Sequence, residues 1–269
     1  MNVTWYDVRD LSDLALLEKV GATVARLDWP DEVFDPTNAT SSDFTDRHLP
    51  PPPDPLLRPR LSAAWHRIFS APFRLAQPVF DPPISRQRLA AQRTPLSGLL
   101  ERSRNWSGAS VAPYGGNHFT EIVGLWSIPT QVAPADGGAA PGQPYRCAAF
   151  IGFDGQGLAF NASMPQIGTM HEVTDGGGGP SKNFFAWWWW WWPGQQPTPP
   201  IPLTNMPLAE GDVIACWITV LTPTLVRFLI LNLTQNIALA PWDYPAPWVL
   251  HDGTLVQVQV SGNTAEWIL

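Results

Sequence analysis

The side chains that could do chemistry gather in four short segments, which are Asn105–Ala109, Phe150–Gly155, Pro165–Gly168 and Ala265–Leu269. The third segment holds Gln166, whose amide can orient a water molecule and stabilise an oxyanion without titrating. A single glutamine is weak evidence, because most glutamines on a strand are only solvated or hydrogen-bonded. Together with Gly168 and the upstream pair Asp154-Gly155, Gln166 forms a moderately specific motif.

In their order and spacing, the four segments resemble the glutamic peptidases of the eqolisin type, also called the peptidase A4 or G1 family. The resemblance covers about residues 102–269. It implies an acid endopeptidase with a Gln/Glu catalytic pair, in which Gln166 stands at the place of the glutamine. The glutamate of such a pair takes a proton from the attacking water and later protonates the leaving nitrogen. The implied substrate is a polypeptide, and no cofactor is implied.

The family's glutamate comes one residue after the stretch that matches Ala265 to Leu269, where this sequence ends. We therefore expect the chain as written to be inactive, and to lack the strands that follow the glutamate in the family. Glu266 lies four positions earlier than the expected place. Residues four apart on a strand share a face but lie about 13 Å apart. On this argument Glu266 is not expected to pair with Gln166.

The resemblance also implies a substrate groove, with Trp106, Phe150 and Asp154 at family positions near it. Phe150 stands where many relatives have tryptophan, so an aromatic wall is kept but an indole donor is absent. For Trp106 and Phe150 taken singly, packing in the core is the commoner role for such residues.

Six consecutive tryptophans, Trp187 to Trp192, form the most unusual stretch of the sequence. Side chains alternate along a strand, so one set would pack in the core and the other would line a groove. We expect Trp188 and Trp190 on the groove side, in contact with substrate. The family has a glutamate three residues before a proline here; counted back from Pro193, that place is Trp190, and the run contains no carboxylate. An expanded codon tract that the strand tolerates would explain the run equally well.

Two other functions stay open from the sequence. An aromatic-lined groove on a β-sandwich could bind peptide or glycan without cutting it. The chain could also be a truncated relic without function. Retention on immobilised peptide or polysaccharide without cleavage would indicate the first, and poor solubility with low cooperativity the second.

Composition excludes several other functions. Residues 105–269 hold three basic and ten acidic side chains, which argues against a nucleic acid or an anionic membrane as partner. No apolar stretch approaches the roughly 18 residues that would span a bilayer. No secretory signal is predicted at the N-terminus. The five histidines and two cysteines show no metal-ligand spacing, so no metal site is expected.

Short runs that alternate or are β-branched and apolar, separated by glycine and proline, predict an all-β fold for residues 105–269. The runs lie at Phe119–Ile128, Val213–Leu221, Leu225–Leu231, Thr254–Val260 and Thr264–Leu269. The connection Thr222-Pro-Thr224 predicts a hairpin between two of them. The family resemblance further implies a lectin-like, concanavalin-like sandwich of two antiparallel sheets.

Residues 1–104 differ from the rest and are expected to form a separate, partly helical and proline-rich segment. Arg102 and Arg104 at its end would suit the end of a propeptide in a secreted peptidase, but a solvated linker is favoured because no export signal accompanies them. Helical spacing predicts helices at Ser12–Leu27, Leu61–Ser70 and Ser85–Arg93. The stretch Asp28–Asp54, which ends in four prolines, is predicted to be a loop or semi-rigid linker.

Overall fold

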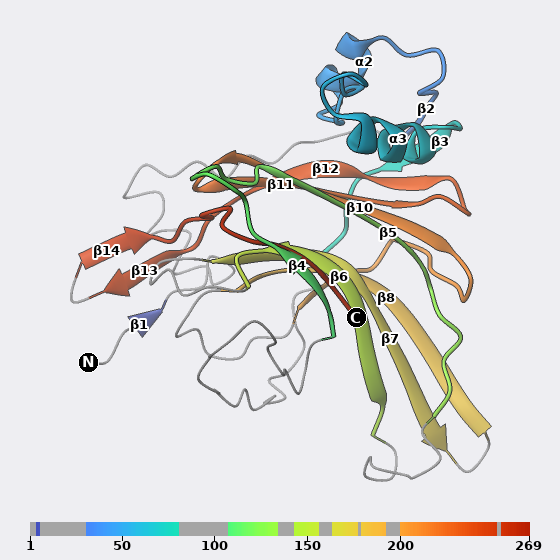
Figure 1. Cartoon of the computed structure of the whole chain (residues 1–269). Coiled ribbons are helices and arrows are strands. Elements are labelled where there is room, and N and C mark those ends of the chain that lie inside the picture. Colours follow the sequence, from blue (N-terminus) through green and yellow to red (C-terminus); the bar gives the residue numbers. More distant parts are fainter. Residues whose placement is uncertain are drawn as a thin grey trace.

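The structure is a computed structural model, and it describes residues 4–5, 31–80, 107–133, 143–155, 163–176, 179–191, 200–251 and 254–269. Its centre is a β-sandwich of two six-stranded sheets that face each other (Figure 1). A small third sheet joins β1 (Thr4–Trp5), β13 (Trp248–His251) and β14 (Thr254–Gln257). The predicted all-β sandwich is therefore confirmed.

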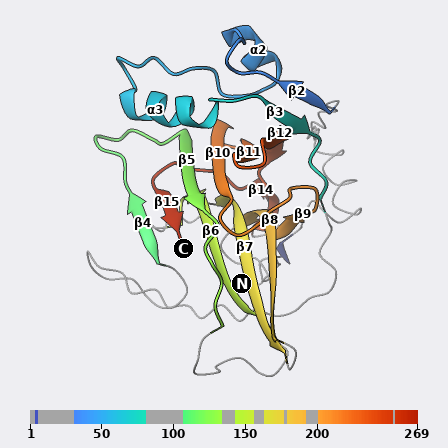
Figure 2. The ribbon, with the colours of Figure 1, turned by 90° about the vertical axis from the view of Figure 1, so that its right-hand side faces the viewer.

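One sheet, called the front sheet below, carries the candidate site. Its strands run in the order β4 (Gly108–Val111), β15 (Ala265–Ile268), β6 (Tyr145–Phe153), β7 (Met164–Gly176), β8 (Gly179–Trp191) and β9 (Ile201–Leu203). All neighbouring pairs are antiparallel. Figure 2 shows β6, β7 and β8 side by side as long strands.

The other sheet, called the back sheet, is built mainly from the second half of the chain. Its order is β2 (Glu32–Phe34), β3 (Phe73–Ala76), β12 (Ile237–Pro245), β11 (Leu225–Asn232), β10 (Val213–Thr222) and β5 (Glu121–Ser127). The predicted hairpin is present, because β10 and β11 pair antiparallel around Pro223 and Thr224. The predicted strands at Phe119–Ile128 and Thr264–Leu269 correspond to β5 and β15.

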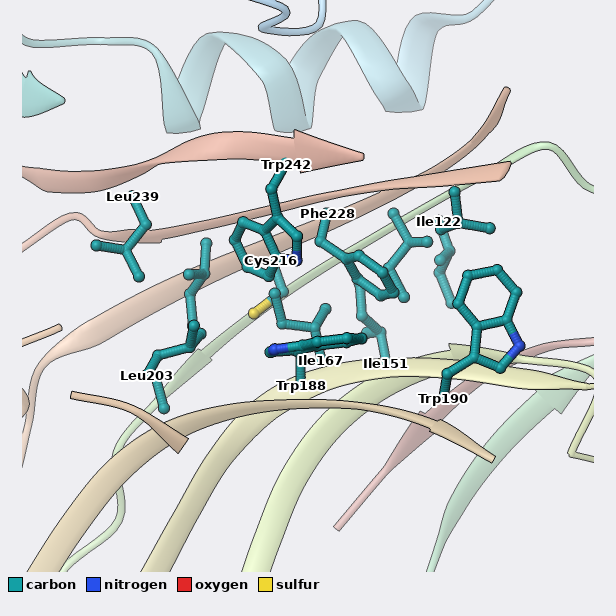
Figure 3. Close-up of a cluster of buried hydrophobic side chains, with 14 of the residues drawn as sticks. Ile122, Ile151, Ile167, Trp188, Trp190, Leu203, Cys216, Phe228, Leu239 and Trp242 are labelled. Carbon is teal, nitrogen blue, oxygen red and sulfur yellow. The ribbon is translucent and has the colours of Figure 1, made fainter. Parts of the chain in front are cut away.

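The main core lies between the two sheets and follows the period of two along each strand. On β6 and β7 the inward side chains include Ile151 and Ile167, neither of which is exposed. From the back sheet, Phe228 and Trp242 stack with ring centroids 5.6 Å apart. Figure 3 shows these side chains pointing toward one another between the sheets. Burial of such large apolar groups is the main stabilising contribution to a fold of this kind.

The stretch Asp28–Asp54 is not the linker that its composition predicts. It holds β2 and the short helix α2 (Ser41–Asp46), which begins with a capping box between Thr40 and Asp43. Phe44 is fully buried and meets the Phe34 ring edge-on at 5.1 Å. The prediction failed because the polar residues that suggest a loop form caps and turns around these buried aromatics.

The second helix, α3 (Pro59–Ile68), matches the helix predicted at Leu61–Ser70. It lies with α2 over the outer side of the back sheet (Figures 1 and 2). A second core forms there, in which Trp65 packs in one cluster with Trp217 and Leu229 of the back sheet. The helices predicted at Ser12–Leu27 and Ser85–Arg93 lie outside the described residues.

The expected division at residue 104 is crossed by backbone pairing. Strand β3, from the N-terminal segment, pairs in parallel with β12 through Arg74, Leu75 and Ala76. The described part of the N-terminal segment thus extends the back sheet and covers it. Separate folding of residues 1–104 stays a prediction, which a stability measurement tests below. Among the described residues, no helix is long and apolar enough to cross a membrane.

Candidate active site

Four residues, one from each of four neighbouring strands, lie in one row across the front sheet: Glu266, Gly152, Gln166 and Trp189. Residues paired directly across strands present their side chains on the same face of a sheet. The residues next to them on β6 and β7, Ile151 and Ile167, point into the core. The row therefore faces away from the core, and this side is called the outer face below.

Gln166 is nearly fully buried on this face, with 3% of its surface exposed. Its side chain leans over Gly152, because an ideal Cβ built there would lie 3.0 Å from Gln166 Cγ. The absence of a side chain at Gly152 is what makes room for it. Among the residues that the structure describes, none forms a hydrogen bond with the Gln166 amide.

Glu266 sits on the other side of Gly152 and is 1% exposed. Its Oε1 accepts a hydrogen bond of 3.0 Å from the Thr264 hydroxyl. The carboxylate lies against the backbone of Gly155, where an ideal Cβ would be 2.0 Å from Oε2. Strand register places Glu266 in the same row as Gln166, with β6 between them. The expectation that Glu266 does not pair with Gln166 stays a prediction.

Asp154 was expected at the substrate groove, and in the structure its carboxylate is hydrogen-bonded to a turn of the chain. Both oxygens accept hydrogen bonds from the turn Ser261–Asn263: from the backbone N–H groups of its three residues and from the Ser261 hydroxyl. The backbone N–H of Asp154 donates to the backbone carbonyl oxygen of Thr264 at 3.1 Å. Asp154 therefore fixes the entry into β15, the strand that carries Glu266. Substrate contact by Asp154 stays a prediction.

The tryptophan run divides between the two faces in the opposite sense to the one expected. Trp188 and Trp190 point into the core, each with 3% exposed surface, and Figure 3 shows both between the sheets. The Trp190 indole donates to the Ser163 hydroxyl at 2.8 Å. The odd-numbered members Trp187 and Trp189 belong to the outer face instead. A run of identical residues carries no alternation of its own, so its sequence does not indicate which members face the core.

A second row of the outer face is apolar and lies next to Gln166. Ile268, Phe150, Gly168 and Trp187 pair across it. Phe150 meets the Trp187 ring edge-on at 5.4 Å and is 8% exposed. Phe150 thus lies beside the Gln166 row, as expected for a groove residue, although packing accounts for most of its surface. Trp106 lies outside the described residues.

The sequence reading missed a polar chain on the inward face of β7. The Trp126 indole donates to the Thr169 hydroxyl at 3.0 Å, and this hydroxyl lies 2.9 Å from His171 Nε2. The other ring nitrogen, His171 Nδ1, lies 3.5 Å from Cys147 Sγ. Burial lowers the His171 pKa to about 4. The period of two along the strand could have located His171, because every second residue after the core residue Ile167 is expected to face the same side of the sheet.

Within the described ranges, no group of three or more His, Cys, Asp or Glu side chains is arranged to hold a metal ion. The site consists of an amide, a carboxylate and aromatic walls. These groups can orient water, take up a proton and hold an apolar side chain.

Comparison with solved structures finds scytalido-glutamic peptidase bound to a transition-state analogue inhibitor, with a TM-score of 0.42 and 19% sequence identity over 61% of this chain and 63% of that chain. It also finds SCP-B, a member of the eqolisin family of peptidases in a complex with the tripeptide Ala-Ile-His, with a TM-score of 0.38 and 18% identity over 61% of this chain and 62% of that chain. The matched part thus spans less than two thirds of either chain. No curated protein matches the sequence.

The sequence model of the peptidase A4 family matches residues 104–269, which is more than half of the chain. This range contains the whole row formed by Glu266, Gly152, Gln166 and Trp189. The chain belongs to the peptidase A4 family.

Proposed function

We propose that this protein hydrolyses peptide bonds as a glutamic-type endopeptidase, on the outer face of the front sheet. The single observation that carries the proposal is the place of Gln166, which is 3% exposed and lies on the outer face in one row with the Glu266 carboxylate. Membership of the peptidase A4 family supports this role for Gln166, which stands at the place of the family's glutamine. The substrate is a polypeptide, and no cofactor takes part.

In this function the Gln166 amide has two tasks. Its oxygen accepts a hydrogen bond from the attacking water and so fixes the direction of attack. Its NH₂ group donates to the oxygen of the tetrahedral intermediate, where negative charge develops. A donor fixed in a site of low dielectric stabilises such a charge more than the same donor does in water. The amide does not titrate, so it keeps both tasks at acid pH.

Burial of the site sets a condition on substrate binding. Gln166 and Glu266 are both almost without exposed surface, so a peptide reaches them only if the residues that cover them move. The outer face also carries partly exposed apolar side chains next to the site, among them Met170 and Phe185. These can receive apolar side chains of an extended peptide as it lies across the strands.

Digestion of an acid-denatured protein, followed by mass spectrometry of the fragments, tests the proposal. The wild-type chain should produce new peptide ends at acid pH, and Gln166→Ala should produce none while its thermal unfolding stays cooperative. Gln131→Ala is the matched control, because Gln131 is also buried at 8% exposure but lies away from the row. Equal cleavage by wild type and Gln166→Ala would refute the assignment.

The second candidate function is binding of peptide or glycan without cleavage. The observation in its favour is the partly buried apolar surface formed by Trp189, Met170 and Phe185 on the outer face. Retention on immobilised peptide or polysaccharide, with no new peptide ends over the same period, would favour binding over hydrolysis. Competition with a soluble sugar would distinguish glycan binding from peptide binding.

A further inference from the structure

We infer that Cys147 and His171 form a binding site for a zinc ion on the inward face of the front sheet. The two residues pair directly across β6 and β7, so their side chains lie on the same face of the sheet. Gln166 lies on the opposite face, so the inference does not depend on the proposed peptidase function. The sequence gives no sign of the pair, because its members lie 24 positions apart along the chain.

The first argument is the distance between the two side chains. Cys147 Sγ lies 3.5 Å from His171 Nδ1. In a tetrahedral site the Zn–S distance is about 2.3 Å and the Zn–N distance about 2.0–2.1 Å, which places the two ligand atoms about 3.5–3.6 Å apart. Sulfur and nitrogen therefore already stand at the spacing that a zinc ion requires of two neighbouring ligands.

The second argument is the way in which His171 is held. Its side chain is 2% exposed, and Nε2 lies 2.9 Å from the Thr169 hydroxyl. With zinc on Nδ1, the ring proton is on Nε2 and is donated to this hydroxyl oxygen. The oxygen can accept it together with the Trp126 indole N–H, 3.0 Å away, because a hydroxyl has two acceptor lone pairs. A hydrogen bond on the other ring nitrogen is the usual support of a zinc-binding histidine.

The third argument is access from solvent. His171 is buried, whereas Cys147 is exposed, so an ion can reach the pair from the side of the thiol. Figure 1 shows why: β6, β7 and β8 continue beyond the back sheet near the connection between β7 and β8. The other thiol, Cys216, is buried in the main core between the sheets and has no such access.

Two protein ligands leave the rest of the coordination shell to water. Within the described ranges no third His, Cys, Asp or Glu side chain joins the pair, so water molecules complete the four ligands that zinc prefers. A thiolate and an imidazole favour zinc over calcium and magnesium, which prefer oxygen ligands. We therefore expect reversible binding of one ion per chain, weaker than at a structural site with four protein ligands.

Binding would join two strands of the front sheet. Cys147 lies on β6, which also carries Gly152, and His171 lies on β7, which also carries Gln166. In the binding step the thiol releases its proton to water and the sulfur forms a bond to the ion, while neither changes its oxidation state. An ion that binds only the folded chain raises the free energy of unfolding by mass action.

Titration with Co²⁺, followed by competition with Zn²⁺, tests the site, because a thiolate bound to Co²⁺ absorbs in the near ultraviolet and one bound to Zn²⁺ does not. Wild type should develop this absorbance with one ion per chain, and Zn²⁺ should abolish it. Cys147→Ser should show none, and His171→Gln should bind at least about tenfold more weakly. Cys216→Ala is the matched control, which removes the other thiol and should bind as wild type does.

A second measurement uses only the wild-type chain. Iodoacetamide alkylates exposed thiols, and mass spectrometry of the peptides reports Cys147 separately from Cys216. At a Zn²⁺ concentration about ten times Kd, alkylation of Cys147 should slow about tenfold, because only a small share of the chains remains free of the ion. Chelation of the ion by EDTA should restore the original rate.

The outcomes decide the inference without any measurement of peptide hydrolysis. Absence of the near-ultraviolet absorbance in wild type, or its persistence in Cys147→Ser, would overturn it. Equal affinity of wild type and His171→Gln would show that the thiol binds the ion without the imidazole, and would also overturn it. If near-UV circular dichroism shows that His171→Gln loses its packing, the alkylation rate of wild type decides, and a rate that Zn²⁺ leaves unchanged would contradict the site.

Discussion

Gly155→Ala tests the placement of the Glu266 carboxylate, on which the candidate site depends. A Cβ at position 155 would lie 2.0 Å from Oε2 and 2.6 Å from both Cδ and Oε1 of Glu266. Ordinary contacts between heavy atoms are about 3.5–4.0 Å, so the carboxylate would have to move by more than 1 Å. It is 1% exposed and bound to the Thr264 hydroxyl, so it has little room to do so.

The magnitude follows from two effects. Overpacking of a filled site costs about 1–3 kcal/mol, and displacing a hydrogen bond to a charged group adds about 1.5–3 kcal/mol when no new partner is found. Alanine in place of glycine stabilises by about 0.4–1 kcal/mol through the unfolded state. We therefore expect Gly155→Ala to lower the free energy of unfolding by about 2–4 kcal/mol.

A double-mutant cycle measured by urea unfolding isolates the contact. Glu266→Ala removes the group that the new Cβ would meet, so Gly155→Ala should be neutral or slightly stabilising in that background. The coupling energy should reach about 2 kcal/mol or more, near the upper part of the range for residues in contact. If Gly155→Ala destabilises equally in both backgrounds, the carboxylate does not lie against Gly155, and the described geometry of the site is wrong.

Three further predictions concern the scaffold. Phe44→Ala should lower the unfolding free energy by about 3–5 kcal/mol in one calorimetric transition, because Phe44 is fully buried in the core shared with the back sheet; two transitions, only one of them shifted, would show that the N-terminal segment folds separately. The fold lowers the pKa of His171 from 6.5 to about 4, so the unfolded chain binds more protons than the folded one between these pH values. The free energy of unfolding should therefore be at its full value above pH 6.5 and fall by up to about 3 kcal/mol as the pH drops to 4. His171→Gln should remove that part of the pH dependence in urea unfolding, and an unchanged slope would contradict it. Trp188→Ala should destabilise by about 3–5 kcal/mol and Trp189→Ala by less than half as much, since only Trp188 lies between the sheets; equal losses would contradict the facing of the run.

The strands could be predicted because their signal is local. In the second half of the chain, β10 and β11 are short runs of mostly β-branched and apolar residues, and the Pro223-Thr224 turn joins them. The helix at Pro59–Ile68 likewise follows from the spacing of its own residues. In each case the residues that form the element also carry the pattern that indicates it.

The N-terminal segment could not be predicted in the same way. Phe34, Phe44 and Leu49 lie among prolines, aspartates and threonines, and neither a period of two nor one of 3.6 connects them. They are buried because helix α3 and the back sheet close over them. Such burial is a tertiary effect, which composition within a short window does not report.

The same distinction holds for the candidate site: some of its features could be predicted from the sequence and others could not. Gln166 and Phe150 were found from the sequence, and both lie on the outer face in adjacent rows. The sequence did not predict that Trp188 and Trp190 face the core, because a run of six identical residues has the same sequence in either register. The position of Glu266 opposite Gly152 depends on how β15 pairs with β6, more than 100 residues away in the chain. Spacing along one strand carries no information about that pairing.

The most direct test of the central claim is the rate at which purified wild type and Gln166→Ala cleave one quenched fluorescent peptide at acid pH. The account predicts measurable cleavage by wild type and a loss of at least a hundredfold in kcat for Gln166→Ala, with unchanged thermal unfolding. Equal rates for the two proteins, or no cleavage by wild type at any pH, would contradict it.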